Sequence, residues 1–406
     1  DRVTSAWVSS HIMALVAEGR LRTGSILPSE RSLAITLDVS RGTVTRAMEQ
    51  LLEHDMLDSK RGSGHRVRLP KRAARPVESL DPHPTLASND AIDLRWTVMP
   101  PHPLVQECAT AVASGIGSIT SLGASPAQGV PELIDAICQH YNRRGLPTSP
   151  EQVVVTNGVI SGLHLSLIAA TRPGALVGVE NPTYPNIPRV VNTERRRITP
   201  LDVASGFPAA LTAVLHSGTL DAAIITPDFH NPTGHVLSDA HRTNILRAAV
   251  SRTPLIIDES LVTFNWRGKE MPPPMVSTDR DSAPTFLVGG TSKSLWAGLR
   301  VGWIRTSRRA TDALANIRLG VDLGAPVIEQ LMAAQLMNRT ADAQAPSHAE
   351  LIATQYRALT DAMARHLPHW TYQAPEGGLS LWCQNLTLPA HELVQRAKER
   401  GVELLP

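Results

Sequence analysis

The sequence predicts a multidomain protein with a small α+β domain first and a large α/β domain, built on a largely parallel sheet, behind it. Three observations predict this fold class. Short helical patterns and a basic hairpin open the chain, a polar, proline-rich stretch follows, and from Ala91 short apolar runs alternate with helical patterns. The 406 residues are too many for one ordinary domain. We expect domains over residues 1–69 and 91–406, a linker over 70–90, and a small C-terminal α+β subdomain from about residue 340.

The amino-acid composition argues against a membrane-spanning or secreted protein and leaves contact with nucleic acid open. No apolar run reaches the roughly 18 residues that a membrane span needs, and the first residues lack the layout of a signal peptide. The three cysteines are far apart, which suits a reducing cytoplasm and gives no metal or disulfide spacing. Residues 59–77 hold seven Lys or Arg and no Asp or Glu. Such a block fits contact with phosphates, and a solvated linker is the alternative.

The first 67 residues follow the pattern of helices joined by a tight turn. The first helix places apolar residues on one face: Val8, Ile12, Leu15 and Val16. Ser29 is a suitable N-cap for a short helix that runs through Leu37. After a turn, a second helix is expected from Arg41 to Asp55, with its apolar residues toward the core: Val44, Met48, Leu51 and Leu52. Gly62 and Gly64 then mark the tip of a hairpin.

Two helices joined by such a turn form a helix-turn-helix, whose second helix enters the major groove of DNA with its N-terminal residues against the bases. Here that end is the segment Ser40–Arg46. It carries two arginines suited to guanine edges and three hydroxyls suited to phosphates. A plain helical hairpin with an N-capping Ser40 is the alternative interpretation.

The motifs LPSER at Leu27–Arg31, VSRGTV at the helix start and the glycines around Gly62 resemble the GntR-type winged helix-turn-helix, over roughly residues 4 to 68. The resemblance implies an operator in double-stranded DNA as partner. It also implies a set of residues that face DNA, with the last at the wing tip: Arg31, Ser40, Arg41, Thr43, Thr45, Arg46 and Gly62. One departure is His65, where the family usually has a small hydroxyl residue.

In the large domain, short apolar runs predict six strands: Val153–Val155, Ala175–Val179, Ala222–Ile225, Leu255–Ile257, Thr285–Val288 and Val301–Ile304. Several of these runs end in Asn, Asp, Gly or Ser. Because ligands bind at the carboxyl ends of parallel strands, we expect a site there.

A protein that binds pyridoxal phosphate (PLP) needs several specific groups: a lysine for covalent attachment, a carboxylate at the pyridine nitrogen, a donor to the phenolic oxygen, a side chain that stacks on the ring, and a phosphate site. Candidates follow the strands in order: Gly158, Tyr184, Asn231, Asp258, Lys293 and Arg300. Each residue alone has an ordinary explanation, such as a surface lysine, a helix cap or a turn.

The joint order of a Gly-containing turn, a Tyr, HNPTG, an Asp and SK-x6-R resembles the fold-type I aminotransferases, over about Ile92 to Trp382. The resemblance implies that Lys293 forms the internal aldimine, Asp258 pairs with the pyridine nitrogen and Asn231 bonds the phenolic oxygen. Tyr184 would stack on the ring. The implied phosphate site comprises backbone N–H groups, a hydroxyl and a guanidinium: Gly158, Val159, Ile160, Ser292 and Arg300.

A GntR-type winged helix joined to such a domain looks like the MocR subfamily. This implies a regulator that senses PLP, or an amine or amino acid that reaches it, and that forms a head-to-tail homodimer. Two alternatives stay open. One is a genuine or bifunctional aminotransferase with an accessory DNA-binding domain, and the other is a scaffold that has lost PLP.

Three departures from the aminotransferase pattern bear on these alternatives. No Tyr follows Asp258 by two or three residues, where relatives bond the phenolic oxygen, and Ser260 is too short to replace it. The chain reaches Pro406 before any segment with a substrate-carboxylate arginine, so either the sequence is cut short or this anchor is missing. Gly290 stands where many relatives have a phosphate-binding hydroxyl, and Thr291 is its expected substitute. We therefore expect a sensor, with at most half-transamination, rather than an efficient enzyme.

Overall fold

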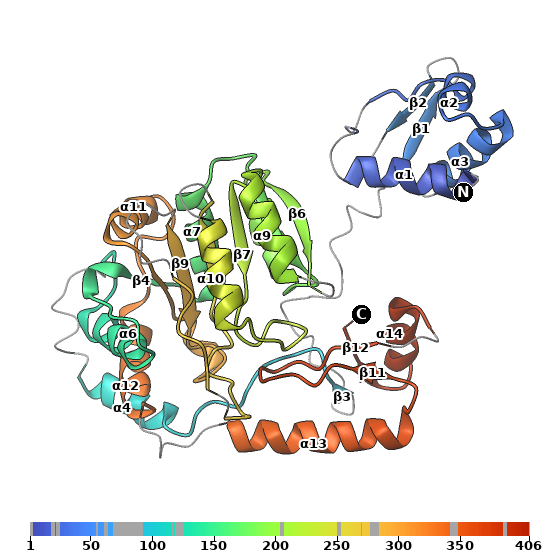
Figure 1. The fold of residues 1–406 in the computed structure, drawn as a ribbon. Coiled ribbons are helices and arrows are strands. Elements are labelled where there is room, and N and C mark those ends of the chain that lie inside the picture. Colours follow the sequence, from blue (N-terminus) through green and yellow to red (C-terminus); the bar gives the residue numbers. More distant parts are fainter. Residues whose placement is uncertain are drawn as a thin grey trace. The chain divides into compact units, whose positions relative to one another are not determined.

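The computed structural model describes residues 3–17, 21, 25–53, 56–60, 64–67, 92–115, 117, 126–203, 207–249, 253–268, 270–276, 284–341, 348–384 and 388–405. The chain divides into two compact units, Asp1–Ala87 and Ser88–Pro406. The predicted linker, residues 70–90, lies outside the described residues. Figure 1 shows the elements of both units.

The described part of the small unit consists of three helices followed by a two-stranded hairpin. Its elements are α1 (Ser5–Ala17), α2 (Glu30–Thr36), α3 (Arg41–Glu53), β1 (Leu57–Lys60) and β2 (Gly64–Val67). The predicted cap is confirmed, because the Ser29 hydroxyl accepts the N–H of Ser32 at the start of α2. The strands pair antiparallel with Leu57 opposite Val67, which confirms the predicted hairpin, although the tip at Gly62 lies outside the described residues.

The small unit has its own apolar core. Val8 and Ile12 of α1 are buried against α3, whose Val44, Met48 and Leu51 are also buried, as the helical periodicity predicts. Strand β2 is joined to the segment before α2 by backbone hydrogen bonds, from Leu27 N–H to His65 C=O (2.8 Å) and from Val67 N–H to Ser25 C=O (2.8 Å). The hairpin is therefore fixed to the helical part.

The described part of the large unit contains a seven-stranded sheet in the order β4-β10-β9-β8-β7-β5-β6. The strands are β4 (Val153–Thr156), β5 (Leu176–Asn181), β6 (Arg197–Asp202), β7 (Ala222–Ile225), β8 (Leu255–Asp258), β9 (Thr285–Gly290) and β10 (Gly302–Arg305). Strand β10 is antiparallel to both neighbours, and the other pairs are parallel. The prediction of a largely parallel sheet is confirmed, with β10 as the exception.

Strand β6 was absent from the predicted strands. Its sequence, RITPLD, is polar and contains Pro200, which cannot donate a hydrogen bond to a neighbouring strand. It pairs only with β5, at the edge of the sheet, where a missing donor on the outer side is tolerated. An edge strand of this composition gives no clear apolar signal.

Two layers of helices cover the sheet. One face packs against α4 (Val105–Ser114), α6 (Pro131–Arg143), α9 (Phe207–Ser217), α10 (Asp239–Ala248) and α12 (Val327–Arg339). The other face packs against α7 (Val159–Ala170), α8 (Asn186–Asn192) and α11 (Arg308–Arg318). Figure 1 shows α9 and α10 in front of the strands and α7 behind them. Strand side chains alternate between these layers, so Leu255 and Ile257 join the first core and Ile256 the second.

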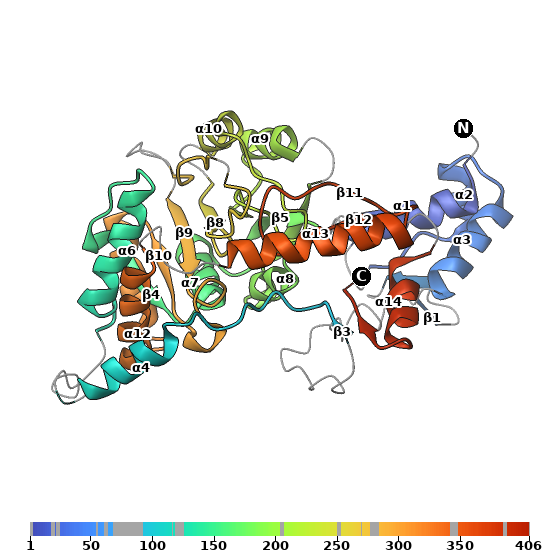
Figure 2. The ribbon, with the colours of Figure 1, turned by 90° about the horizontal axis from the view of Figure 1, so that it is seen from below.

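The C-terminal part is small and mixed, as expected. Helix α13 (Ala349–His366) leads to β11 (Thr371–Tyr372), β12 (Cys383–Gln384), α14 (Ala390–Lys398) and β13 (Val402–Glu403). Strand β13 pairs with β3 (Ile92–Asp93), so the two ends of the large unit meet. Figures 1 and 2 show α13 running from beside the sheet toward α14. Among the described residues, no helix has the length and apolar character to cross a bilayer.

A glycine pair tests the packing of the large unit. Gly129 has φ +124°, and a Cβ added there would overlap the side chain of Val155 on β4, whereas Gly145 (φ +77°) has open space around it. Both alanine substitutions strain the backbone, but only Gly129→Ala also overpacks the core. We expect Gly129→Ala to lower the free energy of unfolding by about 1–3 kcal/mol more than Gly145→Ala. Urea titration of the two variants measures the difference, and equal destabilisation would contradict it.

Candidate functional site

Most predicted cofactor residues follow strands that end at one edge of the sheet. Strands β5, β7, β8 and β9 are parallel. Strand β4 shares their direction, because β10 is antiparallel to both β4 and β9. The carboxyl ends of these strands therefore meet at the same edge, where a ligand site is expected.

Lys293 lies just after β9 with its amine largely buried. Its Nζ donates to the backbone oxygen (2.9 Å) and the hydroxyl oxygen (2.6 Å) of Thr97, a residue from the segment before α4. Burial lowers the pKa of the Lys293 amine, and the nearby carboxylate of Asp258 opposes this shift. A lysine with a lowered pKa has more neutral amine near pH 7, which is the form that attacks a carbonyl.

Asp258, the last residue of β8, is buried. Burial raises the pKa of its carboxyl group, and hydrogen bonds from Ser260 lower it again. One of these bonds runs from the Ser260 N–H to Asp258 Oδ1 over 2.9 Å. Ser260, which stands near the expected position of a Tyr, thus binds the carboxylate. A buried carboxyl group at this position suits a protonated pyridine nitrogen, because an adjacent cation favours the charged form of the carboxyl group.

Tyr184 and Asn231 occupy loops at the same edge. Tyr184 is half-buried, and its hydroxyl accepts a hydrogen bond from Asn186 Nδ2 (2.8 Å). Burial raises the pKa of Tyr184, with smaller electrostatic effects from Asp258 and Arg300, so this ring lies near both charges. Asn231 lies between β7 and α10 at a cis peptide bond to Pro232.

The expected phosphate site brings Gly158 and Arg300 together. Gly158, with φ +83°, precedes α7, and a Cβ added there would lie 3.5 Å from Arg300 Nη2. The Gly158 N–H donates to the Thr156 carbonyl (2.9 Å), so it is already engaged. Val159 and Ile160 are the first residues of α7, where N–H groups have no partner within the helix. They remain the better candidates for a phosphate.

Two neighbouring hydroxyls differ in their surroundings. Thr291 is buried, and its hydroxyl donates to the Val301 carbonyl (3.0 Å). The expectation that it replaces a phosphate-binding hydroxyl is therefore not supported. Ser292 is half-buried next to Lys293, so it stays the better hydroxyl for this role.

These residues fit PLP. The edge holds a buried amine and a buried carboxyl group that interact electrostatically, as the covalent bond and the pyridine nitrogen require. A glycine with positive φ lies against a guanidinium at the start of a helix, leaving a place that a side chain at position 158 would fill. When bound, PLP supplies a carbonyl for covalent attachment and a ring that withdraws electrons.

Sequence reasoning missed two residues at this edge, Thr97 and Glu180. Thr97, which binds the Lys293 amine, has no motif around it. Glu180 on β5 is buried, accepts the Thr226 N–H (3.0 Å) and lies 3.3 Å from His230 Nε2. It also helps to raise the pKa of Asp258. The acidic end of an otherwise apolar strand was the available signal for Glu180.

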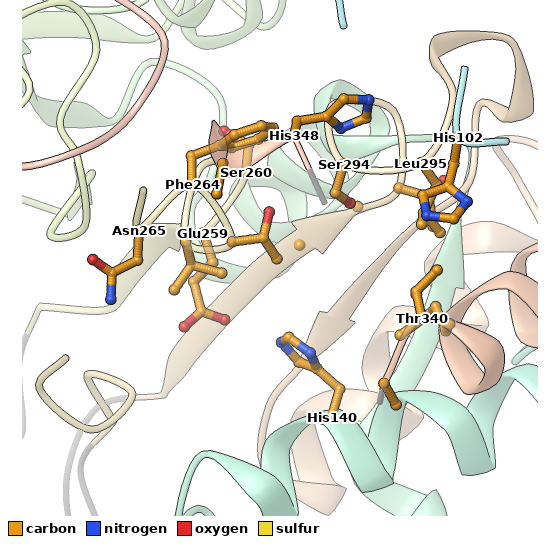
Figure 3. Close-up of a pocket in the computed structure, with 18 of the residues that line it drawn as sticks. His102, His140, Glu259, Ser260, Phe264, Asn265, Ser294, Leu295, Thr340 and His348 are labelled. Carbon is orange, nitrogen blue, oxygen red and sulfur yellow. The ribbon is translucent and has the colours of Figure 1, made fainter. Parts of the chain in front are cut away.

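A cavity of about 470 Å³ lies beside the cofactor candidates. It is lined by Glu259 and Ser260, by His140 of α6 and by His102 and His348, which Figure 3 shows around the same space. Glu259 follows Asp258 and takes the opposite face of the sheet, where it accepts the Tyr141 hydroxyl (2.7 Å). Neither Lys293 nor Asp258 is among the described residues that line this cavity. The cavity therefore lies next to the proposed PLP position and does not include it.

The small unit presents predicted DNA-binding residues on α2 and in the first half of α3. Arg31, Arg41 and Arg46 are exposed, and the Arg41 side chain is 75% exposed. These guanidiniums are therefore accessible to a base edge or phosphate. Gly62 lies outside the described residues.

The predicted hydroxyls are engaged within the small unit. The Ser40 hydroxyl accepts the Thr43 N–H (3.1 Å) and contacts the Thr43 hydroxyl (2.8 Å), so Ser40 caps α3. The Thr45 hydroxyl donates to Glu30 Oε2 on α2 (2.7 Å). Thr45 therefore has no hydroxyl proton to offer a phosphate in this arrangement.

Two family models match the chain. Residues 100–406 match the aminotransferase class I and II family, and residues 4–67 match the bacterial regulatory proteins of the gntR family.

Similar proteins carry the names of regulators. The pyridoxine biosynthesis transcriptional regulator PdxR of Corynebacterium glutamicum is 32% identical over 336 residues, covering 79% of this chain and 69% of PdxR. The uncharacterized transcriptional regulator YisV of Bacillus subtilis is 23% identical and covers 98% of this chain and 88% of YisV.

Solved structures with the same fold are aminotransferases. The α-aminoadipate aminotransferase LysN of Thermus thermophilus has a TM-score of 0.68 at 22% identity, covering 78% of this chain and 83% of LysN. An archaeal alanine:glyoxylate aminotransferase has a TM-score of 0.69 at 22% identity, covering 78% and 81%. The fold, the site at the sheet edge and both family matches agree. The chain therefore belongs to the MocR-type GntR regulators, which join a GntR helix-turn-helix to an aminotransferase class I and II domain.

Proposed function

We propose that the chain is a transcriptional regulator that binds operator DNA through α3 and the wing, and that PLP at the large unit modulates this binding. The observation that carries the proposal is the buried Lys293 beside Asp258, in a chain whose small unit exposes Arg41 and Arg46. PdxR, by its name, regulates pyridoxine biosynthesis. This favours PLP itself as effector, and an amine or amino acid that reaches Lys293 is the second choice.

The proposed cofactor roles follow the sequence prediction. Lys293 attaches PLP, Asp258 holds the pyridine nitrogen, Asn231 contacts the phenolic oxygen and Tyr184 stacks on the ring. The phosphate is held by Ser292 and Arg300 with the N–H groups of Val159 and Ile160, and Gly158 provides space. The proposed boundaries are those of the predicted domains, residues 1–69 and 91–406.

We favour regulation over turnover. The positions two and three after Asp258 hold Ser260, which binds Asp258 itself, and Leu261, which is buried in an apolar cluster. Neither side chain supplies the phenolic donor that aminotransferases use. A genuine aminotransferase is the second candidate, because the solved structures with this fold are enzymes. Steady-state turnover of an amino acid and keto acid pair would favour that candidate.

The proposed working form is a head-to-tail homodimer in the cytoplasm. Leu319, Val321 and Leu323, between α11 and α12, expose 59%, 49% and 67% of their surface. Neighbouring exposed apolar residues of this size favour coverage by a second copy. DNA as partner favours the cytoplasm.

The covalent attachment is tested with Lys293→Ala. Purified protein mixed with PLP should show a visible absorption band that survives desalting, and Lys293→Ala should lose it because the amine of Lys293 is the one that interacts with Asp258 among the lysines that the structure describes. Lys398→Ala is the matched control, since that side chain is 60% exposed. A retained band in Lys293→Ala would exclude Lys293 as the attachment residue.

The lowered pKa of the Lys293 amine is tested in protein without cofactor. Acetic anhydride reacts with neutral amines, so the pH at which labelling of Lys293 is half-maximal reports its pKa. Because burial lowers this pKa below the ordinary 10.5, Lys293 should reach half-maximal labelling at lower pH than the exposed Lys398 of the same molecule. Asp258→Asn should lower the Lys293 midpoint further, because the carboxylate raises that pKa. Mass spectrometry of the labelled peptides measures both, and a midpoint at or above that of Lys398 contradicts the assignment.

DNA binding is tested with Arg41→Ala and Arg46→Ala in the full chain. A duplex selected from a randomised pool by the wild-type protein, with PLP present, serves as operator. Each substitution should cost about 1–3 kcal/mol of discrimination between this duplex and a scrambled one. Fluorescence anisotropy measures the two affinities. Unchanged discrimination in both variants would mean that α3 does not read the bases.

A further inference from the structure

One carboxylate in the small unit contacts three residues on two other elements. Glu30, the first residue of α2, accepts the Thr45 hydroxyl of α3 through Oε2 (2.7 Å). The same oxygen lies 4.0 Å from Nε of Arg41, also on α3. The other oxygen, Oε1, lies 3.4 Å from Nε2 of His65 on β2. Glu30 thus connects α3, the proposed recognition helix, to β2, a strand of the predicted wing.

The bridge is partly shielded from water. The Glu30 and His65 side chains are 25% and 18% exposed. The hydrogen bond from Thr45 is the largest of the effects that hold the pKa of Glu30 below its ordinary value, and His65 and Arg41 contribute too. Glu30 is therefore a carboxylate at neutral pH. His65 Nδ1 is buried without a hydrogen-bond partner among the described residues, so Nε2 makes the polar contact of this ring.

The geometry constrains how α3 meets DNA. The Thr45 hydroxyl oxygen also lies 3.1 Å from the Arg41 carbonyl oxygen, so both acceptors for its single proton belong to the small unit. We therefore expect the methyl group of Thr45, rather than its hydroxyl, to meet a base. Glu30 approaches Arg41 at Nε, which leaves both terminal nitrogens of the exposed guanidinium available for a guanine. A guanidinium oriented in this way loses less side-chain freedom on binding.

We propose that Glu30 and His65 form a positioning bridge that sets Arg41 and Thr45 for base recognition and makes the recognition helix dependent on the wing. The proposal rests on the proposed function, namely that α3 reads operator DNA. Thr45 then discriminates through its methyl group, while Glu30 and His65 touch no base.

This bridge predicts opposite effects on specific and non-specific binding. A carboxylate near the DNA surface repels phosphates, so its loss should strengthen binding to any sequence. Its loss also frees Arg41 and Thr45, which weakens discrimination. A merely structural role would weaken both kinds of binding together.

The test measures the ratio of affinities for the selected duplex and a scrambled duplex, using the full chain with PLP. Glu30→Gln should lower this ratio about tenfold, with unchanged or stronger scrambled binding. Glu53→Gln is the matched control, because Glu53 is exposed at the far end of α3 and carries the same charge. An unchanged ratio in Glu30→Gln, or an equal fall in Glu53→Gln, would overturn the proposal.

The contribution of His65 is tested by a double-mutant cycle. His65→Thr restores the small hydroxyl residue that is usual in the family and should lower the ratio about threefold. The double variant Glu30→Gln with His65→Thr should be no worse than Glu30→Gln alone, because both changes break one bridge. Additive losses would show that His65 acts separately and would reject the bridge.

Two further outcomes are informative. If Glu30→Gln does not fold, Thr45→Val, which keeps the shape and removes the hydroxyl, replaces it. Thr45→Val should also lower the ratio, and an unchanged ratio would count against the bridge. If the wild-type chain selects no duplex at all, the proposed function fails. A selected duplex with an unaltered ratio in the variants rejects only the bridge.

Discussion

The burial of Asp258 and Lys293 at one sheet edge is the constraint on which the large unit depends. Burial disfavours the charged form of both groups, since it raises the pKa of Asp258 and lowers that of Lys293, and hydrogen bonds offset part of this cost. The structure supplies those bonds through the Ser260 N–H and through Thr97. An apolar pair would fill the same space at less cost, which supports the proposal that a ligand uses both groups.

The sheet order and one close approach make the edge possible. The strands that precede candidate residues end at the same edge for two reasons. Strands β5, β7, β8 and β9 are parallel, and β4 shares their direction because β10, which lies between β4 and β9, is antiparallel to both. Gly302 begins β10, and a Cβ there would lie 2.6 Å from the Gly158 carbonyl carbon and 2.9 Å from the Val159 nitrogen. Without a side chain at Gly302, the start of α7 approaches the strand closely and lies where Arg300 also reaches.

Much of this site could be predicted from the sequence, because its residues follow apolar strands in order. Asp258 ends such a run, and Lys293 and Arg300 lie in one motif. Thr97 could not be predicted, because it lies 196 positions from the Lys293 amine and nothing local marks it. The engagement of Thr45 depends on a partner in another helix, which periodicity does not reveal.

The two units illustrate the same limit on different scales. Helix periodicity predicts which face of α3 is buried, as Val44 and Met48 show. It does not predict whether a polar side chain on the open face contacts solvent, DNA or a neighbour. Edge strand β6 was not predicted for a related reason. It pairs with a single strand, so its side chains need not be apolar.

The antiparallel direction of β10 has a consequence for folding. A parallel neighbour of β9 would need a long crossover, but β10 is reached through residues 291–301, which carry both Lys293 and Arg300. Closing a short loop loses little chain entropy, whereas bringing Thr97 to the amine closes a loop of most of the unit. Lys293 and Arg300, the residues proposed to attach PLP and hold its phosphate, are thus brought near each other as soon as two neighbouring strands pair. The remaining contacts form with the later, long-range steps of folding, when the N-terminal segment reaches the sheet edge.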